Sequence, residues 1–256
     1  MEFTDQLGRK IHLDDFPQRI ISLVPSQTEL LVDLGLEDRL VGITKFCIHP
    51  SRLKKSKTII GGTKNIRMEE IHQLNPDLII GNKEENEQGV VLALEKDFPV
   101  WISDVSSVKE ALSMIFELGK ITDTVKRAKE IISSIEEKLN PPLKRKGKAI
   151  YLIWKNPIMV AGKDTFISAM MEWAGFENCM KSTRYPSIIE QELIHIDPEF
   201  LLLSSEPYPF KVSDVAYFQK ILPQTQVLLV DGELFSWYGS RLILARDYFD
   251  KLDNKV

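Results

Sequence analysis

Short apolar runs alternate with more polar, amphipathic segments along the first half of the chain. The runs lie at residues 19–24, 40–43, 78–81 and 100–103. They lack the apolar-polar alternation of a half-exposed strand, and such continuous runs are typical of parallel strands that helices cover on both faces. A helix is expected at residues 68–74, and a small hairpin at residues 3–13.

The segment that follows the first apolar run begins with a helix signal. Ser26 and Glu29 are three residues apart, the spacing of a capping box at the start of a helix. Gly35 fits the position just after the last helical turn. Strands and helices therefore alternate in the first half, which predicts an α/β fold with a mainly parallel sheet.

The second half of the chain repeats this order of elements. Strands are expected at residues 149–154, 200–204 and 226–230, and helices at residues 166–174 and 191–196. Pro76 and Asp77 precede a strand in the first half, and Pro198 and Glu199 precede the corresponding strand in the second. Segments 74–80 and 99–104 thus match segments 196–202 and 225–231. The repeat predicts two related lobes.

A single long helix is expected between the lobes, at residues 123–139. Its apolar positions are Val125, Ala128, Ile131, Ile132, Ile135 and Leu139. They form one helical stripe, and the helix would be about 25 Å long at about 1.5 Å per residue. The predicted domains are an N-terminal α/β lobe at 1–122, the connecting helix and a linker at 123–146, and a C-terminal α/β lobe at 147–256. The basic run 144–148 is interpreted as a solvated part of the linker region.

Composition and charge narrow the classes of function. The 256 residues are 43% hydrophobic and 27% charged with a net charge of −4, so no basic face for nucleic acid is expected. The two cysteines are far apart and predict neither a disulfide framework nor a zinc site. No export signal or membrane span is visible, so the chain is expected to be cytoplasmic or to have lost a leader. Glycine-rich nucleotide loops and the Gly-x-Ser-x-Gly motif are not found, which disfavours an enzyme.

The order and spacing of several motifs resemble one known family. The motifs are residues 17–26 with Thr28 and Glu29, Gly61–Gly62–Thr63, Asn75 to Ile80, Pro99–Val100–Trp101 and the segment 231–241. Together they resemble the helical-backbone substrate-binding proteins of ABC importers, most nearly the cobalamin and iron-siderophore branch. The resemblance covers nearly the whole chain and implies a class III periplasmic binding protein fold.

The resemblance also implies a function. It implies a monomeric, non-enzymatic receptor that captures a metal chelate such as cobalamin, a ferric siderophore or haem in a cleft between the lobes. It further implies delivery to an ABC permease, a periplasmic or cell-surface location and no prosthetic group. The alternatives left open are a cytoplasmic carrier of a corrinoid or metal complex, an enzyme that uses the two-lobed cleft, and a receptor for a bare metal ion.

Aromatic residues that directly follow strands are the first candidates for ligand contact, because ligands of open α/β sheets bind beyond the carboxyl ends of the strands. Phe235, Trp237 and Tyr238 follow the last strand, in a segment that lines the cleft in cobalamin-binding relatives. Trp154 ends another strand. Flat rings of this kind grip a macrocycle or aromatic chelate well. Trp101 and Trp173 lie inside a strand and a helix, where core packing is expected.

The segment after the strand 40–43 offers a mixed set of candidates. Lys45, Phe46, Cys47 and His49 lie there, and Lys83 follows the strand 78–81. They are predicted to contact the ligand. A metal site built on Cys47 or His49 is not expected, because two ligands complete neither a zinc nor an iron site. The other histidines, His12, His72 and His195, are interpreted as surface or structural residues.

Two glutamates are candidates for docking to a permease. In the family that the chain resembles, one exposed glutamate on each lobe meets an arginine of the permease. Glu85 and Glu190 are the predicted positions. Glu84, Glu87 and Glu192 are neighbouring alternatives. Pairs of this kind orient two partners more than they add affinity.

Overall fold

The computed structural model describes residues 1–253, which fold into two compact units. The first unit comprises residues 1–105, 109–136 and 238–241. The second comprises residues 106–108 and 137–237, and the described residues from 242 onward. Two contiguous lobes with a separate linker at 123–146 were expected. Instead, the helix predicted there belongs to the first unit up to Glu136, and a short segment late in the chain returns to that unit.

The first unit is built on a parallel sheet with the strand order β5-β4-β3-β6-β7. The strands are β3 (Ile20–Ser22), β4 (Leu40–Ile43), β5 (Thr58–Ile59), β6 (Leu78–Asn82) and β7 (Val100–Ser103). A hairpin of β1 (Glu2–Thr4) and β2 (Lys10–His12) precedes them. Every residue of β3, β6 and β7 is buried, so the interpretation of continuous apolar runs as two-sided strands is confirmed.

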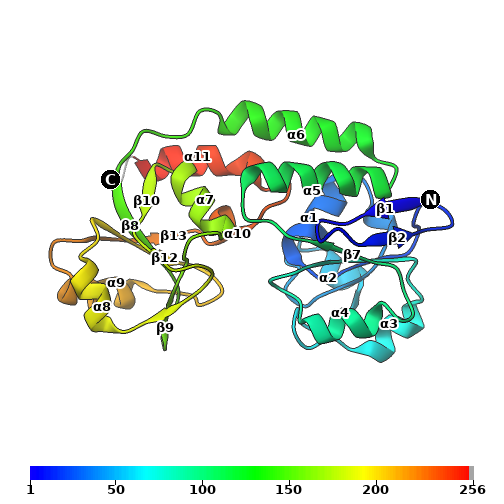
Figure 1. Cartoon of the computed structure of the whole chain (residues 1–256), viewed down its shortest axis with the longest axis horizontal. Helices are drawn as coiled ribbons and strands as arrows, with labels where there is room; N and C mark the ends of the chain where they lie inside the picture. The colour runs from blue at the N-terminus through cyan, green and yellow to red at the C-terminus, as the bar shows by residue number, and fades with distance from the viewer. Residues whose placement is uncertain (254–256) are drawn as a thin grey trace. The chain divides into compact units, whose positions relative to one another are not determined.

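Helices cover both faces of this sheet (Figure 1). They are α1 (Pro25–Asp33), the 3-10 turn η1 (Glu37–Arg39), α2 (Leu53–Ser56), α3 (Met68–Leu74), α4 (Gln88–Leu94), α5 (Val108–Ile121) and α6 (Val125–Leu139). In the figure, α1 and α5 lie on one side of the strands, and α3 and α4 lie on the other. Helices α5 and α6 approach closely, because a Cβ atom at Gly119 would lie 2.5 Å from the Cβ atom of Ala128.

Helix α1 starts differently from the prediction. The capping box at Ser26 and Glu29 is wrong, since Val24 is the N-cap residue and no side chain caps the helix. Pro25 occupies the first helical turn, where its fixed φ favours the helix and its missing N–H costs nothing. Ser26 is therefore already inside the helix and buried. The end is as predicted, because Gly35 adopts a φ of 86° just after the helix.

The second unit contains a mixed sheet with the order β11-β9-β8-β12-β13, in which β10 also pairs with β8. The strands are β8 (Gly147–Trp154), β9 (Ile158–Val160), β10 (Phe176–Asn178), β11 (Ser187–Ile188), β12 (Phe200–Ser204) and β13 (Gln226–Val230). Strands β8, β12, β13 and β10 are parallel, and β9 runs antiparallel to both β8 and β11. Lys146, in the run interpreted as solvated, has a side chain only 5% exposed.

Helices also cover both faces of the second sheet. They are α7 (Phe166–Trp173), α8 (Glu190–Ile196), α9 (Val212–Ile221), α10 (Glu233–Ser236) and α11 (Leu242–Asp253). Helices α8 and α9 lie on one side of the strands, and α7, α10 and α11 lie on the other (Figure 1). Within the described residues of both units, no helix has the length and apolar character needed to cross a membrane.

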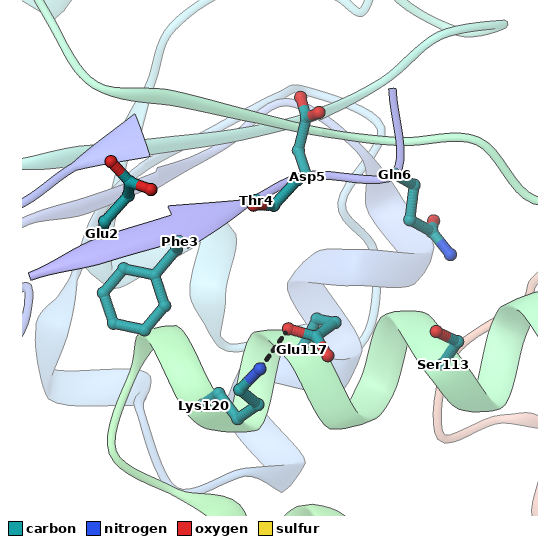
Figure 2. Close-up of a pocket in the computed structure, with 8 residues that line it drawn as sticks. All are labelled: Glu2, Phe3, Thr4, Asp5, Gln6, Ser113, Glu117 and Lys120. Atoms are coloured by element: carbon teal, nitrogen blue, oxygen red, sulfur yellow. Dashed lines mark hydrogen bonds and ion pairs between the residues drawn. The ribbon is translucent and has the colours of Figure 1, made fainter. Parts of the chain in front are cut away.

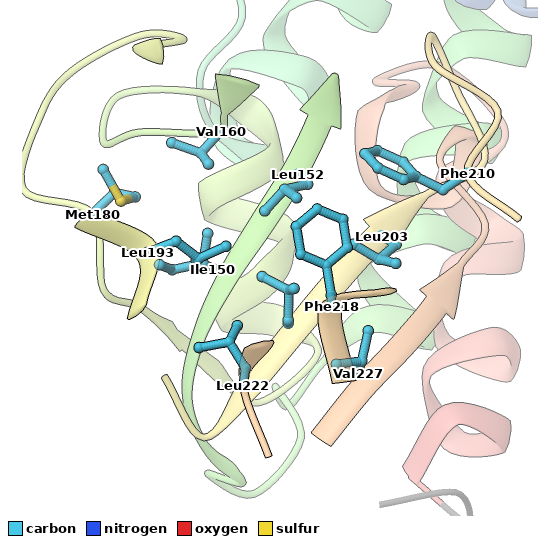
Figure 3. Packing of buried hydrophobic residues seen from close by; sticks show 11 residues of the cluster. Ile150, Leu152, Val160, Met180, Leu193, Leu203, Phe210, Phe218, Leu222 and Val227 are labelled. Atoms are coloured by element: carbon cyan, nitrogen blue, oxygen red, sulfur yellow. The ribbon is translucent and has the colours of Figure 1, made fainter. Parts of the chain in front are cut away.

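Alternate side chains of the central strands build two separate cores. Ile150 and Leu152 of β8 pack on the α8 and α9 side with Leu193 and Phe218, as Figure 3 shows. On the opposite face, Tyr151 packs against the ring of Phe235 in α10, which in turn packs against Phe249 of α11. Such two-sided burial supplies most of the hydrophobic stabilisation of an α/β unit.

The internal repeat predicted from the sequence is visible in the geometry. Helices α3 and α8 both end at a residue with positive φ, Asn75 (44°) and Asp197 (45°). In each half a proline follows this residue, and the acidic side chain after the proline accepts a hydrogen bond from a backbone N–H at the start of the neighbouring strand. Asp77 accepts from the backbone N–H of Arg19 at 2.8 Å, and Glu199 accepts from that of Lys148 at 3.0 Å. The two halves therefore share a local construction, not only an order of elements.

Residues 238–241, here called the strap, attach to α1 of the first unit. Arg241 forms two hydrogen bonds to Glu29, at 2.8 and 2.6 Å, with side chains 12% and 15% exposed. Ser240 donates to Asp33. Gly239 lies so close to α1 that a Cβ atom there would be 2.7 Å from the carbonyl oxygen of Ser26. A buried bidentate pair of this kind fixes geometry as well as charge.

We expect Arg241→Met to lower the free energy of unfolding by about 3 kcal/mol, because it leaves the carboxylate of Glu29 buried without its partner. The measurement is urea unfolding followed by circular dichroism. Arg145→Met is the matched control, since Arg145 and Glu177 pair on the surface with side chains 68% and 50% exposed. The control should cost less than about 1 kcal/mol.

The double variant Glu29→Gln with Arg241→Met should recover most of the loss, because it removes both charges. A loss for Arg241→Met as small as that of the control would contradict the prediction.

Candidate functional site

A surface hollow of about 470 Å³ lies between β1 and α5 of the first unit (Figure 2). Its charged residues Glu117 and Lys120 pair with each other at 2.9 Å. Phe3 supplies its aromatic ring, and none of the residues predicted for the site lines it. Ligands of open α/β sheets bind beyond the carboxyl ends of the strands, and the predicted site residues lie there in each unit.

In the first unit, the loop after β4 exposes an aromatic ring beside a cation. Phe46 is 49% exposed, and the ammonium group of Lys45 lies 5.0 Å from the centre of its ring. Gly62 lies directly behind, since a Cβ atom there would be 3.2 Å from the ring of Phe46. The backbone N–H of Lys45 donates to the carbonyl oxygen of Gly61 at 2.8 Å. The loop therefore leaves the ring of Phe46 exposed, and the ligand contact of Phe46 and Lys45 stays a prediction.

Cys47 lies in the same loop but faces the interior. It is 0% exposed, and its sulfur lies 3.0 Å from Thr28 Oγ1 and 3.3 Å from Thr44 Oγ1. Burial raises the pKa of the Cys47 thiol. The predicted ligand contact of Cys47 is therefore corrected to a packing role. His49 is half-buried at the end of the loop, and residues 1–253 contain no group of three or more metal-ligating side chains.

The loop after β6 is organised by Asn82. The amide nitrogen of Asn82 donates to Ser103 Oγ at 2.9 Å, and its amide oxygen accepts from the N–H of Glu84 at 2.8 Å. Lys83 pairs with Asp104 at 2.6 Å. Its charge is thus balanced within the first unit, which weakens the case for Lys83 as a receptor for an anionic ligand group.

Tyr238 of the strap is buried within the first unit. The residue is 6% exposed, and its hydroxyl donates to Glu85 Oε1 at 3.1 Å. Burial and the nearby charge of Glu85 raise the pKa of Tyr238 well above its ordinary range. Tyr238 therefore does not offer an open ring face. Glu85 is half-buried and occupied by this hydrogen bond, so the predicted free docking carboxylate at Glu85 is not what the structure shows.

In the second unit, Trp154 is the exposed ring at the end of β8. It is 39% exposed, its indole N–H donates to the carbonyl oxygen of Asn156 at 3.1 Å, and its ring meets Tyr208 edge-on at 5.5 Å. The sequence reasoning missed Tyr208, although it lies in the loop after β12. The rule that identified Trp154, an aromatic residue just after a strand, would have identified Tyr208 too.

Glu206, in the same loop as Tyr208, was also missed. Its Oε1 accepts from Trp237 Nε1 at 2.8 Å and from Ser236 Oγ at 3.1 Å. Burial, the largest effect, raises the pKa of Glu206, and the charges of Glu233 and Asp231 raise it further. Trp237 is 7% exposed and donates to this carboxylate, so it does not offer the open ring face that was predicted for ligand contact.

Phe235 belongs to the core of the second unit. It is 0% exposed and packs against Tyr151 at 5.3 Å and Phe249 at 5.0 Å between ring centres. The predicted ligand contact of Phe235 is thus corrected to core packing. The aromatic residues after β13 do not form one cluster. Phe235 packs in the core, Trp237 donates to Glu206, and Tyr238 belongs to the strap.

The glutamates at the start of α8 are partly committed to the second unit. The hydroxyl of Tyr217 donates to Glu190, which is half-buried. Glu192 is exposed and accepts from the backbone N–H of Ile189 at 2.8 Å. The internal repeat aligns this turn with the first turn of α3, which carries Glu69 and Glu70. Both units therefore present an acidic first helical turn at the same place in the repeat.

Comparison with known proteins identifies a family. The periplasmic binding protein family matches residues 20–207. The chain is 25% identical to the uncharacterised ABC transporter substrate-binding lipoprotein YvrC of Bacillus subtilis (strain 168), covering 93% of this chain and 81% of that protein. It is 22% identical to the vitamin B12-binding protein of Pectobacterium carotovorum subsp. carotovorum (strain PC1), covering 90% and 86%.

Solved structures share the fold. The periplasmic heme-binding protein RhuT from Roseiflexus sp. RS-1 matches with a TM-score of 0.80 and 20% identity, covering 93% of this chain and 98% of that one. The periplasmic catecholate-siderophore binding protein VctP from Vibrio cholerae matches with a TM-score of 0.80 and 15% identity, covering 98% and 99%. The predicted α/β fold of the class III type is confirmed.

We expect Glu206→Gln to stabilise the protein at neutral pH. In the folded state the pKa of Glu206 is raised above its ordinary value of 4.5. The protonated side chain therefore contributes to the free energy of unfolding, and this contribution is fully present below pH 4.5. The contribution is lost as the pH rises through the folded-state pKa. Glutamine stays neutral and keeps an oxygen for Trp237 and Ser236. Thermal unfolding from about pH 4 to about pH 7 should show a growing advantage of the variant.

Proposed function

Because the chain belongs to the periplasmic binding protein family, we propose that it is the substrate-binding component of an ABC importer that captures a metal chelate. The proposed ligands are a corrinoid, haem or a ferric siderophore. The relatives are named as binding proteins for vitamin B12, heme and a catecholate siderophore, which supports capture without turnover. In this proposal the chain works as a monomer outside the cytoplasmic membrane and carries no prosthetic group of its own.

The observation that carries the proposal is an exposed aromatic ring at or shortly beyond the carboxyl end of a strand in each unit. Phe46 and Trp154 are 49% and 39% exposed, although half of the chain's phenylalanine, tyrosine and tryptophan residues are buried. Exposing a large ring costs hydrophobic free energy unless a partner covers it. Flat chelates offer complementary surfaces for such rings.

We further propose that the acidic first turns of α3 and α8 meet the permease. Glu69 is exposed on α3, and Glu190 and Glu192 begin α8 at the corresponding place of the repeat. Carboxylates on the first turn of a helix are held at a favourable end of the helix dipole. They could form charge-assisted pairs with arginines and so set the orientation of the two proteins.

Titration of the purified protein with cyanocobalamin, haemin and ferric enterobactin should quench tryptophan fluorescence saturably for one of them. Trp154→Ala should weaken that binding about tenfold or more, because an exposed ring at the centre of a contact dominates its free energy. Trp173→Phe, a change in the half-buried tryptophan of α7, should leave the affinity unchanged. If none of the chelates binds the unmodified protein, the proposed function is refuted.

Charge reversal should separate docking from ligand capture. We expect Glu69→Lys combined with Glu190→Lys to leave the ligand affinity within about twofold while it abolishes uptake by cells that express the complete importer, because like charges repel at the interface. Glu172→Lys, on the exposed side of α7, is the control and should preserve uptake. Normal uptake with the double variant would rule out these two turns as the docking points.

A further inference from the structure

The carboxylate of Glu206 is fixed in position on one side only. Both hydrogen bonds that it receives, from Trp237 and Ser236, end on Oε1. No residue in the described range 1–253 donates to Oε2, and that atom is not among the buried polar atoms that lack a partner. Oε2 is therefore accessible and can accept a hydrogen bond from a ligand. The two hydrogen bonds lower the pKa of Glu206, although burial, the larger effect, raises it overall.

Glu206 shares its loop with Tyr208, the half-buried member of the aromatic pair that Tyr208 forms with the exposed Trp154. Tyr208 is two residues further along, and its ring contacts Trp154 at 5.5 Å. At the end of β12, Ser204 Oγ accepts from the backbone N–H of Glu206 at 3.3 Å and from the hydroxyl of Tyr151 at 2.9 Å. The support of Glu206 thus comes from α10 and from the buried end of β12. A carboxylate held this way is pre-organised, so little entropy is lost when a ligand binds it.

The charges around this loop are unfavourable for an anion. We call residues 155–156, 205–209 and 231–233, which follow β8, β12 and β13, the second-unit edge. Its acidic residues are Glu206, Asp231 and Glu233. Its basic residue, Lys155, is paired with Asp214 at 2.6 Å. Asp214 thus neutralises Lys155, and Glu206 and Asp231 leave the edge negatively charged.

The three chelate classes differ in charge. A ferric tris-catecholate complex is trianionic, and haem carries two propionates. A corrinoid is fringed by amide groups with N–H donors and is neutral or cationic. Like charges that face each other across an interface weaken binding, whereas an amide N–H to a carboxylate is a charge-assisted hydrogen bond.

We propose that Glu206 is a specificity-determining residue that selects a neutral or cationic chelate with amide N–H donors and rejects anionic chelates. This inference rests on the proposed function, because it assigns the ligand class of the same site. It narrows the three ligand classes to the corrinoid type. The aromatic pair supplies the contact area, and the carboxylate supplies the discrimination.

The test compares dissociation constants of cyanocobalamin, haemin and ferric enterobactin for the full chain and for Glu206→Gln. We expect the unmodified protein to bind cyanocobalamin most tightly. Glu206→Gln should weaken cyanocobalamin binding about tenfold, because a hydrogen bond to a charged group is replaced by a neutral one. The same variant should strengthen the binding of the two anionic chelates. Glu172→Gln, an exposed change on α7, should alter none of the three.

A change in the ratio of the affinities for the three chelates distinguishes a role of Glu206 in specificity from a general loss of folded protein. A loss that is equal for all three chelates would show that Glu206 only supports the fold, and tighter binding of an anionic chelate by the unmodified protein would also overturn the inference. In both cases the proposed capture of a metal chelate would still stand. Absence of binding for all three would refute the proposed function, and the inference with it.

Discussion

Parallel strands that are buried on both faces restrict where this protein can offer chemistry. Within β6 and β12 every side chain is buried, so neither strand can present a group to a ligand along its length. The first residues beyond a strand are different, because the sheet still holds their backbone while their side chains leave the core. Trp154 at the end of β8 and Lys83 just after β6 are exposed for this reason. Because helices cover both faces of each sheet, side chains that contact a ligand are expected only at or just beyond the strand ends.

Burial also decides which aromatic residues can contact a ligand. The segment after β13 contains Phe235, Trp237 and Tyr238, and all three are buried. Each has a distinct partner: the core of the second unit, the carboxylate of Glu206 and the carboxylate of Glu85. Aromatic rings suit cores and ligand surfaces equally well, because both reward the removal of apolar area from water.

Regular elements were predictable from the sequence, whereas pairings distant in sequence were not. The expected strands 40–43, 100–103, 200–204 and 226–230 and the helix 68–74 match the structure residue for residue. Local periodicity and proline punctuation determine these elements. Helices α9 and α11 were not predicted. Neither was the hydrogen bond between Trp237 and Glu206, because it joins residues 31 positions apart and no local pattern encodes it.

The strap has a consequence for the order in which the protein can acquire its structure during synthesis. The first unit includes residues 238–241, and the contacts of Arg241 with Glu29 and of Tyr238 with Glu85 span more than 150 positions of the chain. A ribosome has therefore to translate nearly the entire message before the N-terminal unit is complete. A fragment that stops after α6 lacks Arg241, the cation that neutralises Glu29. A gene fusion or truncation at the end of α6 would therefore divide the first unit between two polypeptides.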